Sequence, residues 1–371
     1  MRIIDVECLV VRLPHVQLIA DGNQDALIVK VRTDQGLTGV GEAHTSPTVL
    51  KAIIEAPPSH IYAQGLRDLV LGENPLDHKA IWDKMYRYTA VYGRRGAVIH
   101  AISAIDLALW DLRGKAAGQP VYRLLGGPYR TEVPAYASTL MPEDPRQAPR
   151  EAAKWREEGF RAVKLGWGPL GVDVRRDLAV ASEVRRAVGP DVNLLLDVGY
   201  GMEAQTAIRL AHGLEELNYF LLEEPLSPDD LDGYARLCQA VELPIAAGEK
   251  EATRFGFRDL IERGHVDIVQ PDLARTGGIT EAIRIAEIAL MRNVTVLPHC
   301  WSTDILVAAT LHFIAALPRC PYLEYCVVNS PLRHSLVLDP ILADEGRVRV
   351  PEGPGLGVEL DDEVIAQYRY A

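Results

Sequence analysis

Residues 193–224, NLLLDVGYGMEAQTAIRLAHGLEELNYFLLEE, hold two short apolar runs of strand character, separated by about the length of one crossover helix. The first run ends at Asp197 and the second at Glu223 and Glu224. Polar residues close such runs further along the chain as well, at intervals of 23 to 27 residues: Asp197, Glu223, Glu249, Asp272 and His299. Because all strands of a parallel barrel end on one face, these side chains are expected to converge on one point.

Eight apolar segments continue this pattern over most of the chain. They are VPAYAS (133–138), RAVKLG (161–166), NLLLDV (193–198), YFLLEE (219–224), PIAAGE (244–249), VDIVQP (266–271), VTVLPH (294–299) and YLEYC (322–326). Parallel strands need long crossover connections, which the intervening helical segments supply. The sequence therefore predicts an α/β fold with a (β/α) barrel over residues 131–330.

The two ends of the chain have a different pattern. Residues 1 to about 42 alternate like a meander of strands, and helical patterns follow, most clearly over 97–116, where apolar residues recur at i, i+3 and i+4. Residues 331–371 are rich in Pro and Gly and show no matching final helix. We predict a capping domain over residues 1–130 and a C-terminal segment, 331–371, that returns to it.

Charge and cysteine content limit the classes of function. Lys and Arg total 39 against 51 acidic residues, a net charge of −12, which argues against a broad surface for nucleic acid or anionic membrane. The five cysteines are scattered without CxxC spacing, which indicates reduced thiols in a cytoplasmic protein. No apolar run approaches the roughly 18 residues that span a bilayer, and the N-terminus lacks a signal-peptide pattern. We expect a soluble, unprocessed protein with a small-molecule partner.

The acids at the strand ends are the first candidate site. Three carboxylates without ligand-spaced Cys or His favour a hard divalent cation, Mg²⁺ first and Mn²⁺ next. Acids at strand ends also cap helices or pair with arginines, but three at this spacing make that explanation less attractive. Asp197 and Glu249 are two of the expected ligands. Strand alternation allows only one of Glu223 and Glu224 to face the barrel axis, and the period alone does not choose between them.

Asp272 and His299 are expected to end neighbouring strands. A carboxylate bonded to one imidazole nitrogen fixes the tautomer and makes the other nitrogen a general base near neutral pH. Lys164 ends the second barrel strand, where it could bind a substrate carboxylate, titrate with a lowered pKa, or remain a solvated lysine at the rim. Glu324 ends the eighth strand and could donate a hydrogen bond to an oxyanion if it is protonated.

With these residues the chain resembles the enolase superfamily, and within it the mandelate racemase subgroup. The stretch AISAIDLALWDLRGKAAGQPVYRLLGG (101–127) and the tail PGLGVEL (354–360) also look like family segments. The resemblance implies a modified (β/α)7β TIM-type barrel with an α+β capping domain made from both termini. It implies metal ligands at Asp197, Glu223 and Glu249, a dyad of His299 and Asp272, and Glu324 facing an enolate. It also implies a symmetric homo-oligomer.

One departure from the family pattern bears on the reaction. Racemases of the subgroup carry a KxK pair on the second strand, whereas this chain has Lys164, Leu165 and Gly166. Glycine cannot accept a proton, and racemisation by two bases needs one on each face of the intermediate. The sequence therefore predicts a Mg²⁺-dependent dehydratase of a sugar acid, an aldonate or an aldarate. A racemase or epimerase that uses Lys164 is the alternative; a cycloisomerase or a non-catalytic relative is less expected.

Loops of the capping domain are expected to close over the barrel mouth and set specificity. The candidate loops are 15–23 and 43–50. In the first, His15, Asp21 and Asn23 could bind sugar hydroxyls, although solvated loop residues are an equally good explanation. Trp301, two residues beyond His299, could form a wall of the pocket.

Overall fold

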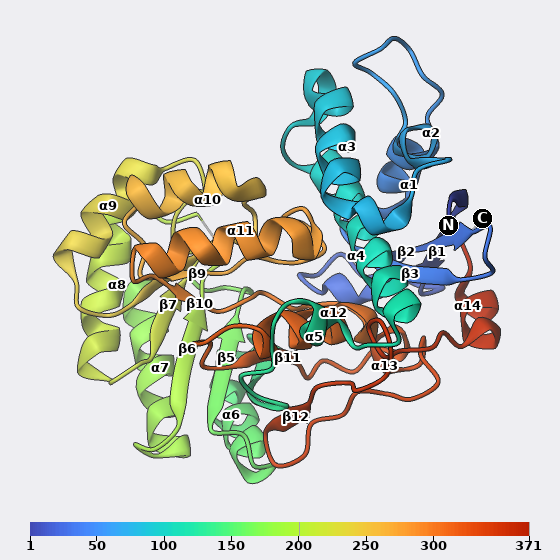
Figure 1. The fold of residues 1–371 in the computed structure, drawn as a ribbon. Coiled ribbons are helices and arrows are strands. Elements are labelled where there is room, and N and C mark those ends of the chain that lie inside the picture. Colours follow the sequence, from blue (N-terminus) through green and yellow to red (C-terminus); the bar gives the residue numbers. More distant parts are fainter. Residues whose placement is uncertain (200, 371) are drawn as a thin grey trace.

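A computed structural model describes residues 1–199 and 201–370. The N-terminal region forms an antiparallel sheet in the order β1 (Ile3–Arg12), β2 (Asp25–Thr33), β3 (Thr38–Ala43). Five helices follow this sheet: α1 (Pro47–Glu55), α2 (Leu66–Val70), α3 (His78–Gly93), α4 (Ala97–Ala117) and α5 (Val121–Leu124). The expected strand meander and the helix at 97–116 are thus present. We call this region the cap (Figure 1).

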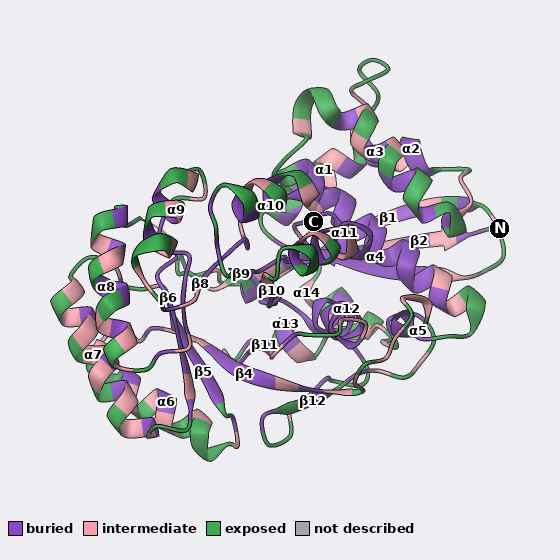
Figure 2. Ribbon diagram, turned by 60° about the vertical axis from the view of Figure 1, so that its left-hand side comes forward, coloured by how far each residue is buried: buried purple, intermediate pink, exposed green. Residues whose placement is uncertain are grey.

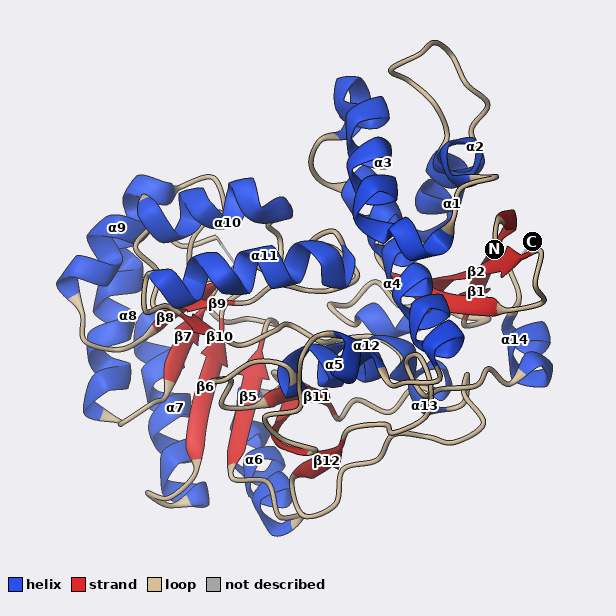
Figure 3. Ribbon diagram, in the orientation of Figure 1, coloured by secondary structure: helices blue, strands red, loops and turns tan. Residues whose placement is uncertain are grey.

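The second region alternates parallel strands with helices. The strands are β4 (Glu132–Leu140), β5 (Ala162–Gly166), β6 (Asn193–Asp197), β7 (Leu221–Glu223), β8 (Ile245–Ala247), β9 (Ile268–Val269), β10 (Thr295–Val296) and β11 (Leu323–Cys326). The helices between them are α6 (Ala148–Glu157), α7 (Val174–Val188), α8 (Ala204–Glu216), α9 (Leu231–Ala240), α10 (Thr253–Glu262), α11 (Gly278–Met291) and α12 (Asp304–Ala315). The helices lie outside the strands (Figure 3). The α/β class and the (β/α)7β architecture are confirmed.

The strands form a curled sheet in the order β10-β9-β8-β7-β6-β5-β4-β11. The backbone N–H of Cys300, just after β10, donates to Glu324 Oε2 on β11 over 2.8 Å, which links the two ends of the sheet. Several strands are shorter than the sequence predicted. β8, β9 and β10 end at Ala247, Val269 and Val296, whereas the predicted segments ended at residues 249, 271 and 299. Pro271 and Pro298 cannot donate to a ladder, and Gly248 has φ of +133°. Glu249, Asp272 and His299 therefore stand on loops directly after their strands.

A small apolar cluster fills the barrel axis. It contains one residue from each of seven successive strands or strand ends: Tyr136, Ala162, Leu195, Leu221, Ala246, Ile268 and Leu297. Strand side chains alternate with period two, so the residue two positions later on each strand also faces the axis, one layer nearer the mouth. This layer carries several polar residues of the site: Ser138, Lys164, Asp197, Glu223 and His299. The strands are buried, whereas the surrounding helices expose their outer faces (Figure 2).

The C-terminal residues contact both regions. After α13 (Pro331–His334), β12 (Arg347–Arg349) pairs antiparallel with β4 of the barrel. α14 (Asp362–Tyr368) lies against β1 of the cap, and the Tyr370 N–H donates to the Val10 carbonyl over 2.8 Å. Both termini consequently lie beside the cap sheet (Figure 1). Among the described residues, no helix combines the length and apolar character needed to cross a membrane.

Candidate active site

The alternation of side chains along each strand determines which residues form the polar layer above the apolar axis cluster. Two positions beyond Ala162, Leu195 and Leu221 on their strands come Lys164, Asp197 and Glu223, and all three are buried. The phase therefore selects Glu223 and not its neighbour for the axis. Glu224 has φ of +47° and turns away, where it accepts a hydrogen bond from the Gly248 N–H at 2.8 Å.

Lys164 occupies the centre of this layer and is only 2% exposed. Its Nζ lies 2.6 Å from Glu223 Oε1, 2.7 Å from Glu324 Oε1 and 3.8 Å from Asp197 Oδ2. Burial alone would lower the lysine pKa, but Glu223 and Glu324 raise it well above its ordinary value. Lys164 is therefore a charged ammonium, contrary to the expected possibility of a lowered pKa.

Glu324 is an acceptor in this structure. Its carboxylate forms an ion pair with the Lys164 ammonium and accepts hydrogen bonds from the Ser138 hydroxyl at 2.7 Å and from the Cys300 N–H at 2.8 Å. Burial would raise its pKa, but Lys164 and His299 hold it below its ordinary value. The expectation of a protonated Glu324 that donates a hydrogen bond is not met by this arrangement.

His299 and Asp272 form the predicted pair. His299 Nδ1 lies 2.6 Å from Asp272 Oδ2, and His299 Nε2 lies 2.9 Å from Glu249 Oε2 at the cavity wall. Burial would lower the His299 pKa, but Glu324, Glu249 and the Asp272 hydrogen bond raise it to about 10. Asp272 is held as a carboxylate, because His44, Arg275 and hydrogen bonds from both histidines outweigh burial and keep its pKa well below its ordinary value. In this arrangement His299 therefore carries a proton on both ring nitrogens at neutral pH, with Nε2 paired to Glu249.

The expected cation ligands form a dense group of negative charge. Asp197 Oδ1 accepts from the Gly199 N–H at 2.8 Å, and Glu249 Oε1 lies 2.6 Å from the Lys250 ammonium. Burial and the neighbouring Glu223 raise the Asp197 pKa well above its ordinary value. Glu223 Oε2 is buried without a hydrogen-bond partner. An all-oxygen, buried set with one unpartnered oxygen fits a hard divalent cation chemically.

The geometry of this group is not yet that of a bound ion. Within residues 1–199 and 201–370, no three His, Cys, Asp or Glu side chains are close enough to hold a metal as they stand. The ammoniums of Lys164 and Lys250 neutralise the carboxylates instead. Asp197, Glu223 and Glu249 would have to turn toward one point to share a cation.

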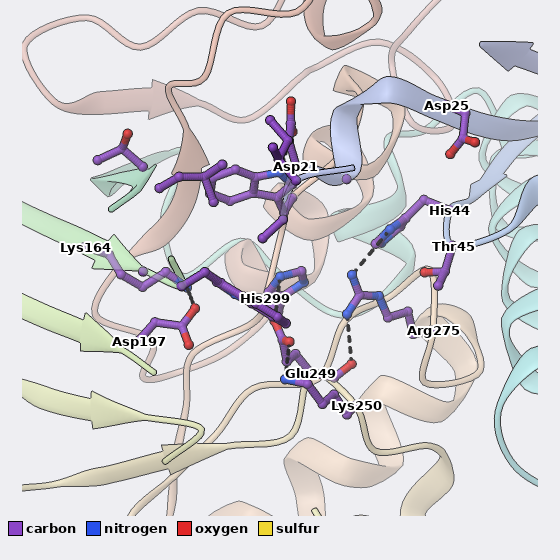
Figure 4. A pocket seen from close by; sticks show the side chains of 18 residues that line it. Asp21, Asp25, His44, Thr45, Lys164, Asp197, Glu249, Lys250, Arg275 and His299 are labelled. Atoms are coloured by element: carbon purple, nitrogen blue, oxygen red, sulfur yellow. Dashed lines mark hydrogen bonds and ion pairs between the residues drawn. The ribbon is translucent and has the colours of Figure 1, made fainter. Parts of the chain in front are cut away.

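Asp197, Glu249, Lys164 and Lys250 open into a cavity of about 380 Å³ at the barrel mouth (Figure 4). Its barrel side is formed by Thr139, Leu140, Lys164, Gly166, Trp167, Asp197, Glu249, Lys250, Arg275, His299 and Trp301. Its cap side is formed by Ile19, Ala20, Asp21, Gly22, Asp25, His44 and Thr45. The cavity therefore lies between the two regions of the chain.

The predicted substrate-binding residues lie in different places. Trp301 lines the cavity, and its indole N–H donates to Asp21 Oδ1 at 3.2 Å. Asn23 is buried behind the wall, where its amide points to Cys326 Sγ at 3.0 Å. His15 is exposed and lies outside the cavity lining. Strand phase does not govern a loop, so loop membership alone could not place these side chains.

The lining residues without a role assigned from the sequence include three with basic side chains: His44, Lys250 and Arg275. Arg275 donates to the Glu249 carbonyl at 3.2 Å and lies 3.4 Å from Asp272 Oδ2. The sequence did contain a signal for two of them. Arg275 is a cation three residues after Asp272, and Lys250 is a cation directly after Glu249. His44 lies within the predicted 43–50 loop, but nothing in its local pattern separates it from the neighbouring polar residues.

Comparison with known proteins identifies the family. Residues 4–126 match the mandelate racemase / muconate lactonizing enzyme N-terminal domain, and residues 147–364 match the enolase C-terminal domain-like family. The chain belongs to the mandelate racemase group of the enolase superfamily. Hydro-lyases are among the relatives of this chain, which supports an enzyme of this class.

Named members of the superfamily resemble the chain over nearly its whole length. An L-rhamnonate dehydratase of Saccharopolyspora erythraea is 37% identical, covering 93% of this chain and 85% of that protein. A D-galactarolactone cycloisomerase of Agrobacterium fabrum is 34% identical, covering 92% and 91%. The crystal structure of the 3,6-anhydro-D-galactonate cycloisomerase from Zobellia galactanivorans superposes with a TM-score of 0.90, 34% identity and full coverage of both chains. A racemase structure from Streptomyces coelicolor with bound magnesium gives a TM-score of 0.88 at 28% identity, covering 99% and 100%.

Proposed function

We propose that the protein is a dehydratase that removes water from a sugar acid. The observation that carries the proposal is the one-sided supply of bases in the cavity. His299 faces the cavity and is held by Asp272 at 2.6 Å, whereas Lys164, the other candidate base, is an ion-paired ammonium and Gly166 has no side chain. A single base suits elimination, in which only one proton leaves carbon.

The geometry around Gly166 supports this asymmetry. A Cβ added there would lie 3.0 Å from Asp197 Cβ and 3.0 Å from Asp197 Oδ2, tighter than nine in ten real Cβ contacts. A lysine in place of Gly166 would therefore press against a residue that the proposed site needs.

In the proposed reaction, His299 Nε2 first gives up the proton that it holds beside Glu249 and then takes the proton from C2, next to the carboxylate. The electron pair forms the C2–C3 double bond, and the C3 hydroxyl leaves as water after it receives a proton, which His299 can return. The resulting enol tautomerises to a 2-keto-3-deoxy acid. Lys164 contributes a fixed positive charge near the developing enolate, and its ion pairs hold it in place.

Asp197, Glu223 and Glu249 would hold Mg²⁺ in this proposal. When bound, such a cation stabilises the charge that develops on the substrate carboxylate. The unpartnered Glu223 Oε2 and the crowding of three carboxylates support this assignment. The cavity then has to accommodate the substrate carboxylate near these residues and the sugar hydroxyls toward the cap.

A second candidate is a cycloisomerase, because two of the similar proteins carry that name. If the leaving oxygen belongs to a ring of the sugar acid, the same proton abstraction opens the ring and no water is released. From the sequence we expected a cycloisomerase less than a racemase. The two relatives named as cycloisomerases now make it the stronger alternative to a dehydratase. His299 would serve both reactions, so the site alone does not separate them.

The product distinguishes these reactions. The purified protein with Mg²⁺ is incubated with a library of aldonates, aldarates and their lactones, and products are followed by semicarbazide and by mass. A dehydratase yields a 2-keto acid lighter by one water. A ring opening leaves the mass unchanged, and a racemase yields no 2-keto acid. Absence of any 2-keto product from the open-chain acids would contradict the proposal.

A further inference from the structure

The cap strand β3 presents two different faces. In TGVGEAH (38–44), Gly39 and Gly41 face α4 so closely that an added Cβ would lie 2.1 Å from the Ala108 carbonyl oxygen and 2.0 Å from that of Ala104. Residues at alternate positions share a face, so Val40, Glu42 and His44 point the other way. That face meets the barrel.

Two of these residues make polar contacts in the barrel. Glu42 accepts hydrogen bonds from the Thr303 hydroxyl and from the Leu306 N–H, at 2.5 Å and 3.1 Å, at the start of α12. His44, only 1% exposed, lies with Nε2 3.0 Å from Asp272 Oδ2. This oxygen also receives His299 Nδ1 at 2.6 Å. A cap residue thus reaches the partner of the proposed base.

The direction of the His44 hydrogen bond follows from its other neighbour. The Arg275 guanidinium lies 3.4 Å from His44 Nδ1, and a guanidinium can only donate. His44 Nδ1 is therefore the acceptor, which leaves the proton on Nε2, pointing at Asp272. The backbone directly after His44 is strained, since Thr45 and Ser46 have φ of +78° and +56°. Such strain is retained where the surrounding structure fixes a conformation, which supports a specific orientation of the His44 side chain.

We propose that His44 is a positioning residue that holds Asp272, and through it His299, in the orientation that proton abstraction needs. This inference rests on the proposed function. Asp272 is held from both ends, because its Oδ1 accepts the Ala274 N–H at 2.7 Å and its Oδ2 accepts from the two histidines. Without His44, the Oδ2 atom loses one donor, and the carboxylate can turn with the His299 ring attached to it.

The proposal gives the cap a second task besides covering the cavity. The proposed base is completed only when β3 is docked on the barrel, because its orientation depends on a side chain from β3. A misplacement of about 1 Å in such a group can reduce a rate by roughly 100-fold. Loss of the His44 hydrogen bond should therefore slow the chemical step while substrate binding persists.

The test compares two substitutions of similar shape. His44→Met removes the donor, and His44→Gln keeps an N–H at about the position of Nε2. With a sugar acid that the wild-type enzyme dehydrates, we expect kcat of His44→Met to fall by about 10- to 100-fold with KM within about threefold. The isotope effect from deuterium at C2 should rise, and His44→Gln should recover most of the lost kcat. His60→Met, at an exposed cap histidine, is the matched control.

Two results would overturn the proposal: a His44→Met enzyme with kcat within twofold of wild type, or equal losses in the Met and Gln variants. If His44→Met does not fold, His44→Asn replaces it, because its amide is too short to reach Asp272 and should be as slow. A wild-type enzyme without any elimination product would contradict the proposed function instead, so the two failures are distinguishable.

Discussion

The two sides of the cavity are built differently. The barrel side is dense in charge and internally paired: Lys164 contacts Glu223 and Glu324, and His299 contacts Asp272 and Glu249. The cap side carries two carboxylates, Asp21 and Asp25, beside the buried His44. Among the described lining residues, those from the cap include no lysine or arginine. The barrel side can supply chemistry, and the cap side can choose the substrate and align one catalytic group.

Removal of the proposed base should have the largest effect and affect the barrel side alone. We expect His299→Asn to lower kcat by about 100- to 10,000-fold, since the variant lacks the group that accepts the C2 proton. Mg²⁺ binding, measured by calorimetry, should persist. His212→Asn, at an exposed histidine of α8, is the control. Dehydration by His299→Asn at a near-normal rate would remove His299 from the mechanism.

Glu249 joins two functions on the barrel side, and its neutralisation should affect both. Glu249→Gln removes a charge from the proposed cation site and from the side of His299 Nε2, 2.9 Å away. We expect Mg²⁺ affinity to fall at least about tenfold, with a lower kcat at saturating Mg²⁺. Glu251→Gln is the matched control, because Glu251 pairs with Arg95 and does not line the cavity. Equal Mg²⁺ affinity in Glu249→Gln and wild type would exclude Glu249 as a ligand.

The cap side should discriminate against a second carboxylate on the substrate. A diacid would place its distal charge near Asp21 and Asp25, where the cap offers no cation among the described lining residues. We therefore expect kcat/KM for an aldonate to exceed that for the aldarate of the same configuration by at least about tenfold, which corresponds to about 1.4 kcal/mol. The measurement is a paired assay of the two acids. A preference for the aldarate would show that a cation outside this lining recognises the distal end.

A change at the junction of the two sides should have the smallest effect. Trp301→Phe keeps the aromatic wall and removes the N–H that donates to Asp21 at 3.2 Å. One hydrogen bond of this kind contributes about 0.5–1.5 kcal/mol, so KM should rise about two- to tenfold with kcat nearly unchanged. Steady-state kinetics provide the measurement. A large loss of kcat would instead give Trp301 a direct part in the chemistry.

The two sides also differ in how far the sequence could predict them. On the barrel side, the period of strand and helix placed Asp197, Glu249, Asp272 and His299 near one another, because strand ends share a face. The choice between Glu223 and Glu224 required knowing that Leu221 faces the barrel axis, which only the structure showed. Strand lengths were overestimated where proline and glycine end the ladder.

On the cap side, the sequence pointed to loops that line the cavity but could not place their individual side chains. A loop side chain is aimed by its individual contacts, so no period could show that Asn23 turns to Cys326 while His15 stays in solvent. His44 could have been approached through the alternation of Gly39 and Gly41 with bulkier residues, which marks a two-faced strand. Its partner Asp272 lies 228 residues away, and only the docking of β3 on the barrel joins them.

The fate of the C2 proton tests the central claim most directly. The wild-type enzyme, with Mg²⁺ and a sugar acid from the library, is allowed to react in D₂O, and the product is examined by NMR and mass spectrometry. Elimination by a single base predicts a 2-keto acid that has lost water and carries one deuterium at C3, delivered when the enol takes a solvent proton. Recovery of the sugar acid with deuterium at C2 and no 2-keto product would contradict the account.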